Sequence, residues 1–112
     1  MTASEAIARA DTLLPNPFPE TEKLRWLRQL DGLLAAEAGE AQPEPYTGES
    51  ELRIAEPDTE TYEHWLEAKM LYTLGEFTRY ANAMTQFNAA YLAYSARRIR
   101  TAPPPPPARA KY

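Results

Sequence analysis

Large hydrophobic residues recur every three or four positions in the C-terminal half of the chain. They stand at Phe77, Tyr80, Met84, Phe87, Tyr91 and Tyr94. Because three and four residues each approximate one helical turn, this spacing places all six on one side of an α-helix. The pattern predicts a long helix over residues 76–100. Its stripe is expected to form core, packed against helices of its own subunit or of a neighbour.

Two shorter helices are predicted in the N-terminal third. The first covers residues 3–14, where Ser4 or Thr2 can cap the N-terminus. The second covers residues 20–38, where leucines recur at helical spacing and Gly39 provides a C-cap. Its expected core residues include Trp26 and Leu30, and its expected solvent-facing bases are Lys23, Arg25 and Arg28.

A third helix is predicted to begin at Asp58 or Thr59, to contribute Trp65 to the core, and to end near Leu74. Gly75 then makes a tight turn or a sharp kink before the long helix. An unbroken helix of about forty residues is improbable in a globular domain, where the mean helix has about 11–12 residues.

Residues 40–57 break the helical pattern, because three prolines and Gly48 oppose a helix there. Within this segment, residues 51–55 alternate polar and apolar side chains as a short strand does. One short strand is not stable alone. It either pairs with a strand of another subunit, which we favour, or lies as an extended arm over the helices.

The pattern as a whole predicts an all-α fold. We expect a small bundle of about four helices, with a long C-terminal helix and one extended loop or short strand around 50–55. The helical domain covers residues 1–100, and residues 101–112 form a flexible, basic, Pro-rich tail. Five consecutive prolines in this tail favour a polyproline II conformation. An exposed spacer is one interpretation of the tail, and binding to an aromatic groove is the other.

Charge changes this picture more than composition does. The 112 residues suit one domain with a modest core, and the absence of cysteine excludes disulfides. The net charge of −4 is unevenly distributed. Acids dominate residues 37–63, where Arg53 is the one base, and five bases but no acid follow Ala93. The two blocks are either solvated separately or in contact, within one subunit or between neighbours.

No residue pattern typical of an enzyme is found. His64 is the single histidine, expected at an exposed helix position. No Gly-rich phosphate loop or nucleophile elbow occurs, and the bases are too few and too terminal to read nucleic acid. Apolar runs are far shorter than the roughly 20 residues that span a bilayer. We therefore expect a soluble protein that is not an enzyme, with no cofactor, no metal and no membrane contact.

Residues 16–37 and 51–94 resemble small virion proteins from the head–tail modules of tailed phages and prophages. A turn with proline and asparagine precedes a KxRWxxxLD-like helix, and a later segment resembles a Gly-Glu turn followed by RYxNxMxxFNxAYxxY. The matching residues are Lys23, Arg25, Trp26, Leu30, Asp31, Tyr62, Tyr72, Gly75, Glu76, Arg79, Tyr80, Asn82, Met84, Phe87, Asn88, Ala90, Tyr91 and Tyr94.

The resemblance implies a head–tail connector (adaptor): a helical subunit of a ring, typically twelvefold, beneath the portal. Its implied partners are further copies of itself, the portal protein and a tail or stopper protein, and DNA passes through the channel without sequence-specific binding. Its implied location is the virion neck, with the host cytoplasm before assembly. The alternatives are another tail-completion or stopper protein, or a non-viral helical adaptor that binds a partner protein.

Two groups of charged residues are candidates within this hypothesis. A ring needs two complementary patches on each subunit, and the candidates for the subunit or portal interface are Glu51, Arg53, Glu56, Arg97, Arg98 and Arg100. A DNA channel works best when its wall does not bind phosphate. The candidates for channel-facing acids are Glu40, Glu44 and Glu49.

Overall fold

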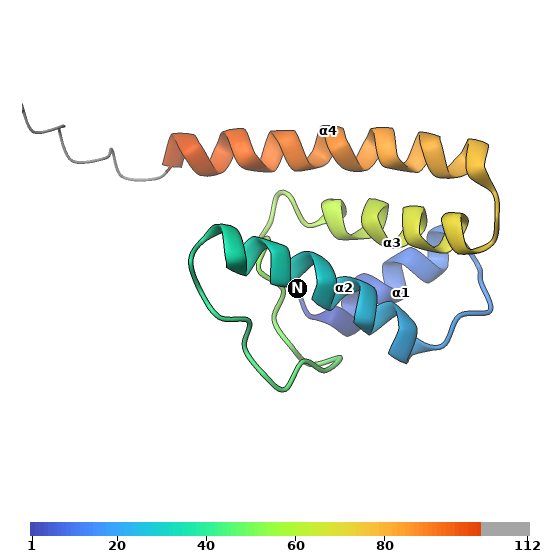
Figure 1. Ribbon diagram of the computed structural model, residues 1–112, viewed down its shortest axis with the longest axis horizontal. Helices are drawn as coiled ribbons and strands as arrows, with labels where there is room; N and C mark the ends of the chain where they lie inside the picture. Colours follow the sequence, from blue (N-terminus) through green and yellow to red (C-terminus); the bar gives the residue numbers. More distant parts are fainter. Residues whose placement is uncertain (102–112) are drawn as a thin grey trace, which may run out of the picture.

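The computed structural model describes residues 1–101, and in this range the chain forms four α-helices and no strand. They are α1 (Ala3–Leu13), α2 (Glu20–Glu37), α3 (Glu60–Thr73) and α4 (Phe77–Thr101). Figure 1 shows α3 in the middle of the molecule, with α4 along one side and α1 and α2 on the other. The predicted all-α fold with a long C-terminal helix is confirmed. The predicted tail lies outside the described residues, apart from Thr101 at the end of α4.

Helix α1 begins at Thr2 as the cap, not at Ser4. The Thr2 hydroxyl accepts from the Glu5 amide at 3.3 Å, and the Glu5 carboxylate accepts from the Thr2 amide at 3.2 Å. This reciprocal pair is a capping box, which satisfies two amides that a helix start leaves without partners. The amides of Ala3 and Ser4 donate to the carbonyls of Ser50 and Gly48. The segment after α2 therefore helps to cap α1.

That segment, residues 40–57, is an extended arm rather than a strand. Its one ladder contact is an isolated antiparallel bridge from Glu51 to Thr2 of the same chain. Leu52 and Ile54 point inward and are buried in the core of their own subunit. The structure therefore shows the second of the two alternatives, an extended arm that packs over the helices of its own chain, and pairing with a neighbouring subunit stays a prediction.

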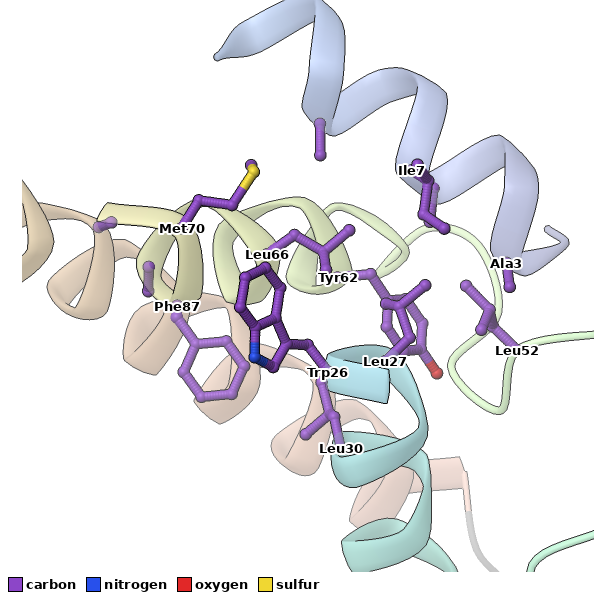
Figure 2. Packing of buried hydrophobic residues seen from close by; sticks show 14 of the residues in the cluster. Ala3, Ile7, Trp26, Leu27, Leu30, Leu52, Tyr62, Leu66, Met70 and Phe87 are labelled. Atoms are coloured by element: carbon purple, nitrogen blue, oxygen red, sulfur yellow. The ribbon is translucent and has the colours of Figure 1, made fainter. Parts of the chain in front are cut away.

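The core lies between α3 and the other elements. Figure 2 shows Trp26, Leu27 and Leu30 of α2 facing Tyr62 and Leu66 of α3. Trp26 and Leu30 are buried as predicted. The other residues of the cluster come from all four helices, from the arm and from Leu14, which follows α1. Five further residues predicted as core are partly buried against this cluster: Trp65, Tyr80, Met84, Tyr91 and Tyr94.

Phe77 was predicted as core and is exposed, with 61% of its surface accessible. It is the first residue of α4, whereas α3 has already ended at Thr73. Its ring contacts the Tyr72 ring, with the two centroids 5.7 Å apart. Helical spacing placed Phe77 near the correct side of α4, but no neighbouring helix extends far enough to cover it. Phe87, in the middle of α4, is buried as predicted.

Lys23 was predicted to face solvent and is instead buried, with 4% of its surface accessible. Its ammonium lies 2.7 Å from Oδ1 of Asp11 in α1. Oδ1 of Asp11 also accepts from the side-chain amide nitrogen (Nδ2) of Asn16, in the turn between α1 and α2. A buried ammonium needs such a partner, because an unpaired charge in the interior is costly. Lys23 therefore joins α1 to α2.

Gly75 forms the predicted turn between α3 and α4. Its φ is +77°, and the Glu76 amide donates to the Leu71 carbonyl at 2.9 Å, which closes the C-terminus of α3. This left-handed conformation favours glycine, because a side chain there would strain the backbone. The turn reverses the chain and places α4 alongside α3.

Replacement of Gly75 by alanine is expected to lower the free energy of unfolding by about 1 kcal/mol. Gly32 is the matched control: it lies inside α2, and a β-carbon there would meet no atom within 4 Å. Alanine at Gly32 should raise stability by up to about 1 kcal/mol. Urea unfolding of both variants measures the two effects. If both substitutions changed the free energy of unfolding in the same direction, the assigned geometry of the Gly75 turn would be contradicted.

Candidate interaction surfaces

A buried hydrogen-bond network fixes the arm against α2 and α3. The Tyr62 hydroxyl donates to Asp31 Oδ1 at 2.6 Å and accepts from the Ile54 amide at 2.7 Å. The Tyr46 hydroxyl donates to Asp31 Oδ2 at 3.1 Å. Asp31 thus links two tyrosines that follow it in the sequence by 15 and 31 residues. The network positions the charged residues that the arm carries.

The network shifts the pKa of its members. Burial raises the pKa of the Asp31 carboxyl, and the hydrogen bonds from the two tyrosines oppose this effect in part. Burial, together with the nearby Asp31 charge, raises the pKa of Tyr62 and of Tyr46 far above the ordinary value. Both tyrosines therefore stay protonated and act as donors at neutral pH.

The arm and the end of α4 form a charged hollow of about 220 Å³. Its lining residues are Arg53, Ala55, Glu56, Asp58, Tyr94, Arg97 and Arg98. Arg97 Nε donates to Asp58 Oδ2 at 3.0 Å, and the Arg98 guanidinium lies 5.6 Å from the Tyr94 ring centroid. The acidic and basic blocks of the sequence therefore meet here within one subunit.

The charged hollow contains four of the six candidate interface residues, namely Arg53, Glu56, Arg97 and Arg98. Glu51 does not line it, and its carboxylate lies 2.7 Å from the Met1 ammonium beside α1. Arg100 is exposed in the last turn of α4 and does not line it either. The structure thus separates Glu51 and Arg100 from the other four.

The three candidate channel acids all lie on the arm, but their surroundings differ. Glu40 accepts from Arg53 Nη1 at 3.2 Å, and Glu44 forms an ion pair with Arg28 of α2. Glu49 is exposed, and residues 1–101 provide no base that forms an ion pair with it. Of the three, Glu49 presents its charge to solvent most directly.

Sequence reasoning missed an aromatic groove between α3 and α4. The groove encloses about 340 Å³ and is lined by Trp65, Ala68, Lys69, Tyr72, Tyr80 and Met84. The Tyr72 and Tyr80 rings meet edge to face at 5.2 Å, and Lys69 Nζ lies 4.7 Å from the Trp65 ring centroid. The seven-residue spacing from Trp65 to Tyr72 on α3 is the sequence signal that points to this groove.

A second hollow shares Trp65 with the aromatic groove. It encloses about 320 Å³ and is lined by Leu30, Leu33, Glu37, Trp65, Phe87, Asn88 and Tyr91. The Tyr91 hydroxyl lies 2.9 Å from a Glu37 carboxylate oxygen, and this hydrogen bond links α4 to α2. The open side of the hollow exposes Leu33, so apolar surface continues from the groove toward α2.

The described residues 1–101 hold no group of three His, Cys, Asp or Glu side chains placed to bind a metal. His64 is partly buried rather than exposed as expected, and its Nε2 lies 3.4 Å from Glu60 Oε1. No helix in this part of the chain has the length and apolar character needed to cross a membrane. Comparisons with protein-family models, curated proteins and solved structures found no match for the chain.

Proposed function

We propose that the protein is a head–tail connector subunit, which forms a ring beneath a phage portal and lets DNA pass. One observation carries this proposal: the two stretches that resemble phage connector proteins pack against each other, and one of the contacts between them joins two matching residues, Asp31 and Tyr62. Tyr62 donates to Asp31 at 2.6 Å. The indole of Trp65 donates to the carbonyl of Trp26 at 2.7 Å. The matching residues lie on α2, α3, α4 and the turn between α3 and α4, and the proposal treats these three helices as one packed unit.

The distribution of surfaces is compatible with a ring. A closed ring repeats one heterologous contact, so each subunit must present two different patches. The charged hollow lies where α4 approaches the arm, and the aromatic groove lies toward the turn at Gly75. These patches differ in chemistry and occupy different parts of α4. Within this proposal, Arg100 is the base best placed to reach a neighbour or the portal.

The channel hypothesis now favours Glu49 over the other two acids. Glu40 and Glu44 are paired with Arg53 and Arg28 in the same subunit, so their charges are partly compensated. Glu49 lies in the turn of the arm beside Gly48 and is exposed. An acidic side chain at the channel wall would repel DNA phosphates and reduce their binding.

Co-assembly with a portal tests the proposal. The full chain is mixed with purified portal rings of the phage or prophage that encodes it, and the mixture is imaged by electron cryo-microscopy. A ring of this protein on one face of the portal is the expected result. Portal rings that carry no added density at saturating protein would refute the connector function. In an assembled particle, Glu49 on the outer wall would refute its assignment to the channel.

Alanine at Arg97, Arg98 and Arg100 together is expected to weaken portal binding or ring closure by at least about tenfold, because interface charge pairs contribute on this scale. A matched control replaces Arg25 and Arg79, which are exposed bases paired with Glu22 and Glu76 on their own helices. Co-sedimentation with portal rings measures the binding of the triple variant and of the control variant. Equal binding by the two variants would show that the basic end of α4 is dispensable.

A helical adaptor that binds a partner protein is the second candidate function. The aromatic groove favours it, because exposed aromatic clusters with a few polar groups are typical of protein-binding sites. The two functions differ in which surface is essential. Alanine at Tyr72 should leave portal binding intact if the charged residues of α4 make that contact, and should abolish partner binding if the groove does.

A further inference from the structure

The aromatic groove is an open, ordered surface with no occupant from residues 1–101. Tyr72 has 58% of its surface accessible, although its ring packs on both Phe77 and Tyr80. The indole N–H of Trp65 is engaged by the Trp26 carbonyl, which fixes the orientation of the ring. The groove is therefore preformed, so a ligand would not need to order its walls.

We propose that this groove binds the five prolines at 103–107 of a second copy of the chain. A run of prolines favours polyproline II, and this conformation docks into grooves lined by aromatic rings. Trp65, Tyr72 and Tyr80 supply the rings, and Met84 supplies an adaptable apolar wall. No other segment of the chain contains a run of consecutive prolines.

The polar groups of the groove match the backbone of a proline run. Proline has no amide hydrogen, so such a ligand presents carbonyl acceptors and no backbone donors. The groove offers the Lys69 ammonium and the hydroxyls of Tyr72 and Tyr80, all of which can donate. It contains no carboxylate that would need a donor from the ligand. The donors of the groove can therefore bind the carbonyls that a proline run presents.

Chain length excludes the protein's own prolines as the occupant. Trp65, at the near edge of the groove, packs on Phe87, which lies 14 positions before Thr101 in α4. This separation corresponds to about 21 Å of helix. Pro105, at the centre of the run, is four residues past Thr101 and reaches about 12 Å at about 3.1 Å per residue. The chain would also have to reverse direction, so the groove is filled from a neighbour.

The exchange would connect neighbouring copies through their C-terminal ends. Each copy offers one groove and one proline run at different places, so the contact is heterologous and can be repeated around a ring. This inference stands apart from the connector function, since any assembly of this chain could use it. It names a ligand for the aromatic groove, which the connector proposal counts as a ring patch without naming its partner, and it gives a role to the proline run, which that proposal does not use.

The test uses the full chain with all five prolines replaced by serine, so that its own tails cannot compete. A synthetic peptide of residues 101–112 is added, and the two indole N–H signals are followed by NMR. The Trp65 signal should shift with saturation, and more than the signal of the buried Trp26. The same peptide with serine for proline is the control. A Trp65 signal that does not respond to the proline peptide would overturn the proposal.

Variants in the same serine chain locate the binding site. Tyr72→Ala should weaken peptide binding about fivefold, since one aromatic contact contributes on the order of 1 kcal/mol. Tyr72→Phe, which keeps the ring, should retain most of the affinity. Leu92→Ala is the matched control, because Leu92 is exposed on α4 and does not line the groove. If the serine chain binds the proline peptide with the same affinity with and without Tyr72→Ala, the proposal is overturned.

Sedimentation of the full-length proteins decides whether the contact joins two copies. The chain with its prolines intact should associate as its concentration rises, and the serine chain should remain at the monomer mass under the same conditions. Added peptide should dissociate the first protein by competition. A proline-containing chain that stays monomeric while its groove is occupied would refute exchange between copies.

Discussion

Replacement of Asp31 by alanine is expected to lower the free energy of unfolding by about 3–5 kcal/mol, because it leaves two tyrosine hydroxyls without the acceptor that they share. Asp31 is fully buried and accepts from the hydroxyls of Tyr62 and Tyr46. Without the carboxylate, both hydroxyls lose their acceptor, and a hydroxyl left without a partner in the interior costs about 1–3 kcal/mol. Urea unfolding followed by far-ultraviolet circular dichroism measures the loss.

The effect of this substitution should depend on pH in a defined direction. Burial raises the pKa of Asp31 above its ordinary value, so the folded protein holds this proton more firmly than the unfolded chain does. The contribution of Asp31 to stability is therefore complete below its ordinary pKa and declines as pH rises through the raised pKa. The stability difference between the wild type and Asp31→Ala should be larger at acidic pH than at neutral pH.

Tyr62→Phe separates the hydrogen bonds from the charge. This variant keeps the buried ring but removes the hydroxyl that bridges Asp31 and the Ile54 amide. We expect a loss of about 2–3 kcal/mol, since a carboxylate and an amide each lose a partner. Glu49→Ala, at an exposed position of the arm, should change stability by less than about 0.5 kcal/mol. An Asp31→Ala loss as small as that of Glu49→Ala would contradict the assigned role of the network.

The helices could be predicted from the sequence because their ends carry local signals. Pro19 precedes α2, Gly39 follows it, and Gly75 separates α3 from α4 with the left-handed turn that its lack of a side chain permits. Apolar spacing then identified the buried side of each helix. These signals depend on residues within one or two turns of each other, so they need no knowledge of the tertiary fold.

Buried polar residues could not be predicted in the same way. Lys23 and Asp31 lie on the apolar side of α2, as their spacing from Leu27 allows, but their partners are distant in sequence. Lys23 pairs with Asp11 of α1, and Asp31 with tyrosines of the arm and of α3. A polar residue within an apolar stripe is a sequence signal for burial. The identity of its partner depends on how the elements pack.

The surfaces were the least predictable part. Helical spacing assigned the whole stripe of α4 to the core, yet α4 packs closely only along α3 and reaches α2 through side chains such as the Tyr91–Glu37 pair. Its first turn therefore remains exposed at Phe77, and its partly covered rings line the aromatic groove. Periodicity shows which side of a helix is apolar but not the length of the element that covers it. The charged hollow likewise depends on where the arm passes α4.

Ile54→Ala is expected to lower the free energy of unfolding by about 2–4 kcal/mol, as for other large-to-small substitutions in a core. Ile54 is fully buried in the core, although it belongs to an arm without regular secondary structure. The loss has two parts: the transfer free energy of the apolar atoms that are removed, and the cost of the cavity that their removal leaves. Thermal or urea unfolding of the wild type and of Ile54→Ala, at one protein concentration, gives the difference in stability.

The same substitution at Ile99 is the matched control, because that isoleucine has 74% of its surface accessible in the last turns of α4. Alanine there should change stability by no more than about 0.5 kcal/mol. Concentration supplies the second control. If the arm packs within its own subunit, the Ile54→Ala loss is the same at low and high protein concentration, whereas a strand shared between subunits makes the loss concentration-dependent. The latter result would restore an intermolecular arm and contradict the packing of Leu52 and Ile54 in their own core.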